Sequence, residues 1–200
     1  MITSKIRKEK TKMDKTRLET FTDAVIAIIM TVMVLELARP NSDQLGSLVS
    51  LLLHIGVYFA SFFILSIYWV NHHHLFQPIR RINGRILWIN IGFIFILSLI
   101  PIFSNWASHY INSFIPELCY TLIFFLGNIF YLFLTKELLK INSHIKISSS
   151  TVKKNVISLF FNVFSIILGY YIAPFLMIIG SVLVFSLWMI PDQNTERMFK

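Results

Sequence analysis

A carboxylate lies inside the first long apolar stretch of the chain. Residues 17–38 are apolar over about the length of one bilayer crossing, yet Asp23 lies within them and Thr31 lies near their middle. A charged side chain inside a membrane helix costs several kcal/mol unless it has a partner, so Asp23 is a candidate functional residue.

The acid and the hydroxyl lie on different faces of this predicted helix. At roughly 100° per residue, Ala24, Ile28, Thr31 and Leu35 fall on one stripe, whereas Asp23 points roughly 140° away from Ile28. The stripe is a narrow apolar lining with one hydroxyl, which is the pattern of a pore face. The acid is left for neighbouring helices to hold.

The composition is that of an integral membrane protein. Of the 200 residues, 56% are hydrophobic and 19 are Phe, which excludes an ordinary soluble domain. The net charge of +8 comes from short basic blocks between apolar runs, a pattern of membrane topology and not of nucleic-acid binding. Cys119 is the single cysteine, so we expect no intrachain disulfide and no cysteine metal site. The prediction is an all-α integral membrane protein in a lipid bilayer, with no nucleic-acid partner.

Six apolar segments follow one another along the chain. A basic N-terminal arm, residues 1–16, is expected to precede a transmembrane domain over residues 17–190, and a tail, residues 191–200, to follow it. The apolar run 156–190 is too long for one crossing at ~1.5 Å per residue, and Pro174 divides it in two. The predicted helices lie at about 17–38, 45–75, 85–104, 115–136, 154–173 and 174–190.

The basic residues predict the orientation. Of the 18 Lys and Arg residues, Arg39 alone falls on the side of the membrane opposite to the chain ends. The positive-inside rule therefore places both termini in the cytoplasm.

Several polar side chains are expected to meet Asp23 at one depth, in the cytoplasmic leaflet. Trp69, His72 and His73 lie at the inner end of the second helix, and Asn90 lies near the start of the third. A hydrogen-bonded cluster of these groups would satisfy the acid and fix the first helix against its neighbours. The alternative is that they are ordinary interface residues, with Trp69 in the aromatic belt and the histidines in a wet loop.

The histidines of the chain do not predict a metal site. Three consecutive residues of a helix, here His72 to His74, point about 100° apart and do not converge on one ion. His54 and His109 are expected to be isolated residues near the outer side. Glu36 either lines an outer vestibule or lies among lipid head groups.

The first helix also carries a motif. Arg17, Phe21, Thr22 and Asp23 resemble the RxxxF(S/T)D signature of the first helix in the transmembrane protein 175 family of potassium channels. The similarity continues through residues 24–36 and through residues 68–73 of the second helix.

The resemblance implies a cation channel that has no TVGYG filter and whose first helix lines the pore. The constriction would consist of Ile28, Thr31 and Leu35, with Ala24 and Val32 beside it. The structural polar network would consist of Arg17, Phe21, Thr22, Asp23, Trp69, His72, His73 and Asn90.

The resemblance also implies an assembly. Animal members of the family carry two six-helix repeats and form dimers, whereas this chain holds one repeat, so four copies would build the pore. We expect K⁺ as the permeating ion, no cofactor, no enzymatic activity, and a prokaryotic plasma membrane. Two other classes stay open: a small-molecule secondary transporter or substrate-binding membrane component, although broken helices are not evident, and an intramembrane enzyme using Asp23 and a histidine.

Overall fold

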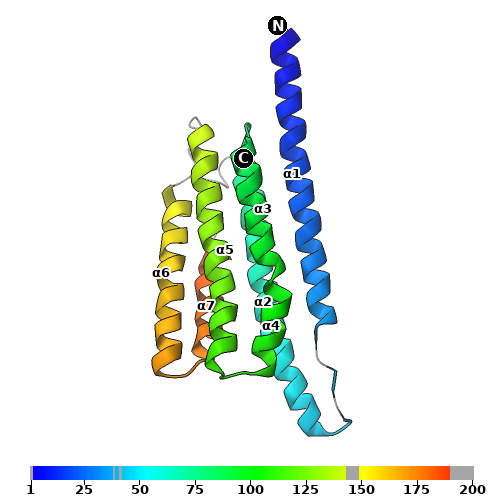
Figure 1. The fold of residues 1–200 in the computed structure, drawn as a ribbon, viewed down its shortest axis with the longest axis vertical. Coiled ribbons are helices and arrows are strands. Elements are labelled where there is room, and N and C mark those ends of the chain that lie inside the picture. Colours follow the sequence, from blue (N-terminus) through cyan, green and yellow to red (C-terminus); the bar gives the residue numbers. More distant parts are fainter. Residues whose placement is uncertain (1, 38, 41, 143–148, 190–200) are drawn as a thin grey trace.

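The chain forms an all-helical bundle, shown as a computed structural model in Figure 1. The structure describes residues 2–37, 39–40, 42–142 and 149–189, and these contain no β-strand, which confirms the predicted all-α class. The predicted tail, residues 191–200, lies outside the described residues. The helices are α1 (Ile2–Leu35), α2 (Leu45–Phe76), α3 (Gly84–Ser98), α4 (Ile100–His109), α5 (Phe114–Ile141), α6 (Ser149–Tyr171), α7 (Leu176–Ser186) and the 3₁₀ helix η1 (Leu187–Met189).

Among the described residues, five helical stretches are long and apolar enough to cross a membrane. The last apolar stretch, Leu176–Met189, is shorter, and at ~1.5 Å per residue it reaches roughly 20 Å against a hydrocarbon core of about 30 Å. The protein is therefore a multi-pass membrane protein. The long stretches are Lys15–Leu35, Leu45–Phe76, Gly84–His109, Phe114–Ile141 and Thr151–Tyr171.

Helix α1 is longer than predicted. The prediction separated an arm, residues 1–16, from the first membrane helix, whereas the structure has one helix from Ile2 to Leu35. Residues 2–35 contain neither Gly nor Pro, so nothing in them interrupts the helix. The N-terminal part of α1 projects beyond the other helices at one end of the bundle (Figure 1).

The third apolar segment is two helices rather than one. The prediction was a single helix over 85–104, but α3 ends at Ser98 and α4 continues from Ile100 to His109. Pro101 lies in the first turn of α4, where its missing N–H is tolerated but cannot continue the ladder of α3. The backbone N–H of Leu99 instead donates to the carbonyl of Ile96 at 3.2 Å, a tighter turn that separates the two helices.

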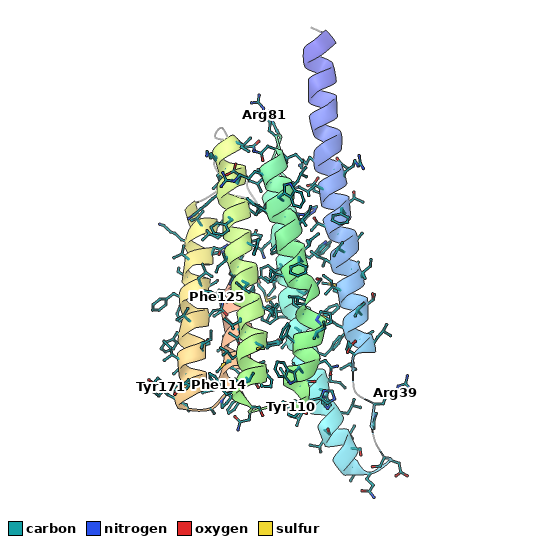
Figure 2. The ribbon with its side chains drawn as sticks, viewed as in Figure 1. Arg39, Arg81, Tyr110, Phe114, Phe125 and Tyr171 are labelled. Atoms are coloured by element: carbon teal, nitrogen blue, oxygen red, sulfur yellow. The ribbon has the colours of Figure 1, made fainter. Side chains whose placement is uncertain are left out.

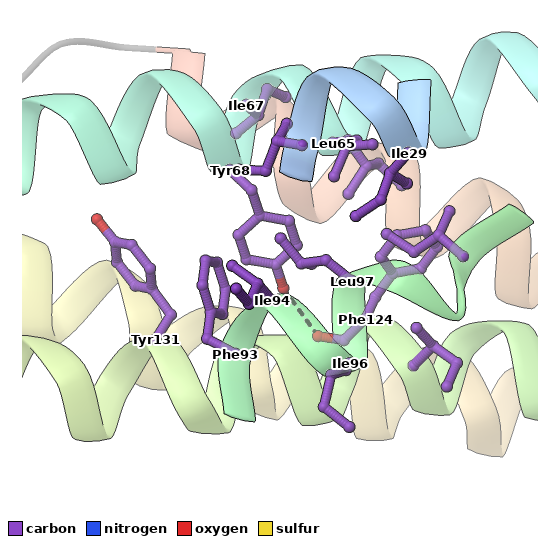
Figure 3. Packing of buried hydrophobic residues seen from close by; sticks show 14 of the residues in the cluster. Ile29, Leu65, Ile67, Tyr68, Phe93, Ile94, Ile96, Leu97, Phe124 and Tyr131 are labelled. Atoms are coloured by element: carbon purple, nitrogen blue, oxygen red, sulfur yellow. Dashed lines mark hydrogen bonds between the residues drawn. The ribbon is translucent and has the colours of Figure 1, made fainter. Parts of the chain in front are cut away.

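Tyr68 of α2 lies at the centre of the core (Figure 3). Its hydroxyl donates to the carbonyl of Phe124 at 2.9 Å, the bond drawn dashed, and lies 3.2 Å from Oδ1 of Asn128. Its ring packs edge-on against Phe93 and Phe185, with centroids 5.4 and 4.9 Å away. A buried Tyr of this kind adds a large apolar contact and satisfies its own polar atom, so α2 is fixed to α3, α5 and α7 together.

The two ends of the bundle carry different basic residues. Figure 2 shows Arg39, in the connection between α1 and α2, at the end opposite to Arg81, which precedes α3. The same view shows Tyr110 and Tyr171 at the same end of the bundle as Arg39.

Candidate functional site

One face of α1 is packed inside the bundle. Leu18, Thr22, Ile26, Ile29 and Met33 are all buried, at spacings of three and four residues that keep them on one side of a helix. Helix α1 contacts α2, α3 and α4. This packing fixes the rotation of α1 about its own axis.

The predicted pore stripe is the opposite, uncovered face of α1. Ile28 is 60% exposed and Leu35 is 80% exposed, and Ala24, Thr31 and Val32 are exposed as well. At roughly 100° per residue, Ile28 points about 160° away from the buried Ile26. In one chain this apolar stripe is therefore free to meet lipid, water or other copies of α1.

The direction of the hydrogen bond made by the Thr31 hydroxyl is defined. Its Oγ1 donates to the carbonyl of Ile28 at 2.8 Å, and a carbonyl can only accept, so the single hydroxyl hydrogen is used within the helix. What the oxygen still offers are its acceptor lone pairs. Thr31 thus places an acceptor, suited to a cation, beside the apolar Ile28 side chain.

Asp23 is bound to α2. Nε1 of Trp69 donates to Oδ1 of Asp23 at 2.9 Å, and an indole N–H can only donate. Hydrogen bonds to a charged acceptor are stronger than neutral ones, so this contact fastens α1 to the C-terminal part of α2. Trp69 itself is 42% exposed, so the pair lies at the surface of the chain.

A second hydrogen-bonded chain joins three helices, and its direction follows from its first link. Oγ1 of Thr22 donates to the carbonyl of Leu18 at 2.9 Å, so it accepts from Nδ2 of Asn90 at 2.7 Å. The amide oxygen Oδ1 of Asn90 therefore faces His72, whose Nε2–H donates to it at 2.9 Å. Thr22, Asn90 and His72 are all buried. The polar residues that the sequence placed in one cluster thus form two separate sets.

Other residues of the predicted network lie outside both hydrogen-bonded sets. His73 is exposed, with its ring 6.0 Å from that of His74, and Arg17 and Phe21 are exposed too. At the other end of α1, Oε2 of Glu36 accepts from Nδ2 of Asn105 at 2.8 Å, which ties α1 to α4.

The contact between His54 and His109 was not predicted from the sequence. His54 and His109 were expected to be isolated, but their ring centroids lie 4.6 Å apart. They come from α2 and α4, and no local pattern connects residues so far apart in the sequence.

Comparison with known proteins identifies the family. Residues 17–101, from the motif of α1 to the start of α4, match the family model described as endosomal/lysosomal potassium channel TMEM175. A protein of Chryseobacterium sp. (strain P1-3) named as a potassium channel is 38% identical over 193 residues, which cover 94% of this chain and 99% of that protein. The chain belongs to the TMEM175 family. The resemblance seen in the RxxxF(S/T)D motif is thereby confirmed.

Other members of the TMEM175 family relate to the chain more distantly. The endosomal/lysosomal proton channel TMEM175 of Danio rerio is 33% identical over 90 residues, which are 42% of this chain and 17% of that protein. The crystal structure of a lysosomal potassium-selective channel TMEM175 homolog from Chamaesiphon minutus superposes with a TM-score of 0.79 at 21% identity, covering 89% of this chain and 97% of that one. That likeness shows the fold. These relatives are named as channels, a family without enzymatic activity, so the enzyme alternative is excluded.

Proposed function

We propose that the chain is one subunit of a homotetrameric, potassium-permeable cation channel whose pore is lined by α1. The observation that carries the proposal is the division of α1 into a buried face and a bare apolar face, on which Ile28 and Leu35 are the most exposed of the large hydrophobic side chains. A relative matched over almost its whole length is named as a potassium channel, which supports K⁺ as the ion.

Four copies account for the bare face of α1. A cyclic ring of identical subunits closes on itself and gives each copy the same environment. One chain supplies a single six-helix repeat, and the bare stripe carries large apolar side chains that a ring would remove from lipid. The orientation that fits this assembly has both chain ends in the cytoplasm of a prokaryotic cell, with Arg39 outside the plasma membrane.

The constriction of such a ring would lie at Ile28. Its branched side chain cannot replace the hydration shell of an ion, and narrow apolar necks in channels gate by dewetting. K⁺ gives up hydration water more readily than Na⁺, so a tight neck with few replacement ligands favours K⁺. The acceptor lone pairs of Thr31, next along the stripe, supply partial coordination. The chain contains no TVGYG sequence, so no ring of filter carbonyls contributes.

The polar network would support this neck without touching the ion. Asp23 points roughly 140° away from Ile28 and is bound to Trp69. Thr22, on the buried face, is bound to Asn90. Both contacts hold α1 at the rotation that turns Ile28 outward from the bundle. Arg17 shares the direction of Ile28 within about 20°, which places it at the inner mouth of the proposed pore.

Reconstitution in liposomes tests the proposal. Single-channel currents in K⁺, with smaller currents in Na⁺, support a channel and reject a secondary transporter, which does not pass ions at channel rates. Because the Danio rerio relative is named as a proton channel, proton flux is measured in the same vesicles. Flux of protons without K⁺ current would reject K⁺ as the ion, and native mass spectrometry showing a stable monomer or dimer would reject the tetramer.

A further inference from the structure

A polar pocket lies where α1 passes into α2. It has a volume of about 540 Å³ and lies between the α1–α2 connection, the first turns of α2 and the end of α4. This end of α2 projects beyond the other helices in Figure 1. Its polar lining consists of Arg39, Ser47, Ser50, His54, Ser108 and His109.

Hydrogen bonds fix the neutral tautomer of His109. Its Nδ1 lies 2.9 Å from the backbone carbonyl of Asn105, and a carbonyl can only accept, so Nδ1 carries the hydrogen. In a neutral imidazole the other nitrogen then holds a lone pair. Nε2 of His109 is therefore an available acceptor or ligand.

The same reasoning fixes His54. Its Nδ1 lies 2.8 Å from Oγ of Ser108, and that hydroxyl donates its only hydrogen to the carbonyl of Asn105 at 2.8 Å. Ser108 therefore accepts from His54, so Nδ1 of His54 carries the hydrogen and Nε2 holds the lone pair. Both histidines are held by one anchor, the carbonyl of Asn105 and the hydroxyl of Ser108.

Both histidines line the same pocket. The Nδ1 edge of each ring is bonded near the end of α4, so its Nε2 edge is left out of these hydrogen bonds. The ring centroids are 4.6 Å apart with the planes inclined at 48°. A histidine that donates its second ring N–H to a carbonyl or other acceptor has the arrangement found in most metal-ligating histidines.

We propose that this pocket binds a divalent transition-metal ion through Nε2 of His54 and Nε2 of His109. Imidazole suits Zn²⁺, Ni²⁺ and Cu²⁺, whereas Mg²⁺ and Ca²⁺ take oxygen ligands. Among the described residues, no three His, Cys, Asp or Glu side chains lie together so that they could hold a metal ion, so water completes the coordination and the ion exchanges with solvent. The bound ion joins α2 to α4 at the end where α2 is least covered.

Arg39 separates this proposal from its competitor. The guanidinium lines the same pocket, where it weakens the binding of a cation and would strengthen that of an anion such as phosphate. Removing this charge by Arg39→Gln is therefore expected to tighten metal binding, and to weaken binding if the pocket takes anions.

Thermal unfolding of the untagged full chain in detergent tests the site, with ZnCl₂ as the probe. At about ten times the dissociation constant, Zn²⁺ should raise Tm by roughly 3–6 °C. His54→Gln and His109→Gln should abolish the shift. His74→Gln is the matched control, since it removes an exposed histidine outside the pocket, and should retain it. MgCl₂ should give no shift.

The outcomes separate cleanly. His109 is exposed, so His109→Gln is expected to unfold at the wild-type temperature without metal, and its failure to respond to Zn²⁺ supports the site. Equal Zn²⁺ shifts in wild type and both pocket variants overturn the proposal. A shift with phosphate that disappears in Arg39→Gln, with none for Zn²⁺, assigns the pocket to anions and also overturns it.

Discussion

Asn90 offers the sharpest test of the network beneath the proposed pore. Asn90→Leu keeps the forked shape and the number of heavy atoms but removes both hydrogen bonds, so the buried Nε2–H of His72 loses its acceptor and Thr22 loses a donor. An orphaned buried donor costs about 1–3 kcal/mol, and a hydrogen bond inside a membrane protein is worth about 0.6 kcal/mol on average. Together these give roughly 1.6–3.6 kcal/mol per chain, or a fall in Tm of roughly 3–14 °C.

A second substitution should recover most of that loss. His72 stacks on Phe76, with ring centroids 4.5 Å apart, and lies nearly parallel to Phe93 at 6.0 Å. His72→Phe in the Asn90→Leu background therefore keeps an aromatic ring in the stack and removes the orphaned donor. Because replacing both partners of a buried hydrogen bond by apolar groups can be nearly neutral, the double variant should return to within about 1 kcal/mol of wild type.

The assay measures thermal unfolding of wild type, both single variants and the double variant in one detergent, followed by K⁺ and Na⁺ flux in liposomes. His72→Phe alone should also destabilise the protein, since it leaves Oδ1 of Asn90 without its donor. The preference for K⁺ should be unchanged in every variant that assembles. A double variant no more stable than Asn90→Leu, or an altered ion preference in a stable variant, would refute the supporting role assigned to these residues.

Substitutions at three further positions address the stripe and the acid. Ile28→Asn should raise K⁺ flux and relax the preference over Na⁺, because polar groups let water enter the neck; unchanged flux and preference in an assembled tetramer would place the constriction elsewhere. Thr31→Ala should weaken the preference for K⁺ without reducing flux, whereas Thr31→Ser, which keeps the oxygen, should match wild type in paired K⁺ and Na⁺ gradients. Asp23→Asn should cost about 1 kcal/mol in thermal stability, since a neutral acceptor binds the indole of Trp69 less strongly than a charged one; a stable Asp23→Asn variant with a sharply changed ion preference would contradict its role as an anchor.

The sequence predicted the depth of the polar residues but not their pairing. Asp23, Trp69 and Asn90 were expected in one layer because each lies near the predicted cytoplasmic end of its membrane helix. Which of these side chains bond to one another depends on the rotation of each helix about its axis. That rotation is set by packing between residues far apart in the sequence, such as the packing around Tyr68. Thus Asp23 is bound to Trp69, while Asn90 is bound to Thr22 instead.

Helix ends were predictable where the chain carries a local signal. The turn at Pro174 follows from the missing N–H of proline. The break at Leu99 was not predicted. A proline late in an apolar run can mark the end of one helix or the first turn of the next, and Pro101 lies in the first turn of α4. The pairing of His54 with His109 has no local signal of any kind, since it arises only when α4 is laid against α2.

The uninterrupted course of α1 has a mechanical consequence. The segment from Ile2 to Ile28 is one helix with no joint, about 39 Å long at ~1.5 Å per residue, and its first part stands clear of the bundle (Figure 1). The packed stretch from Leu18 to Met33 includes the level of Ile28, so a tilt or rotation of the projecting end is passed along one rigid helix to the proposed neck. A partner that binds the projecting end would therefore act on the proposed pore lining with no flexible linker to absorb the motion.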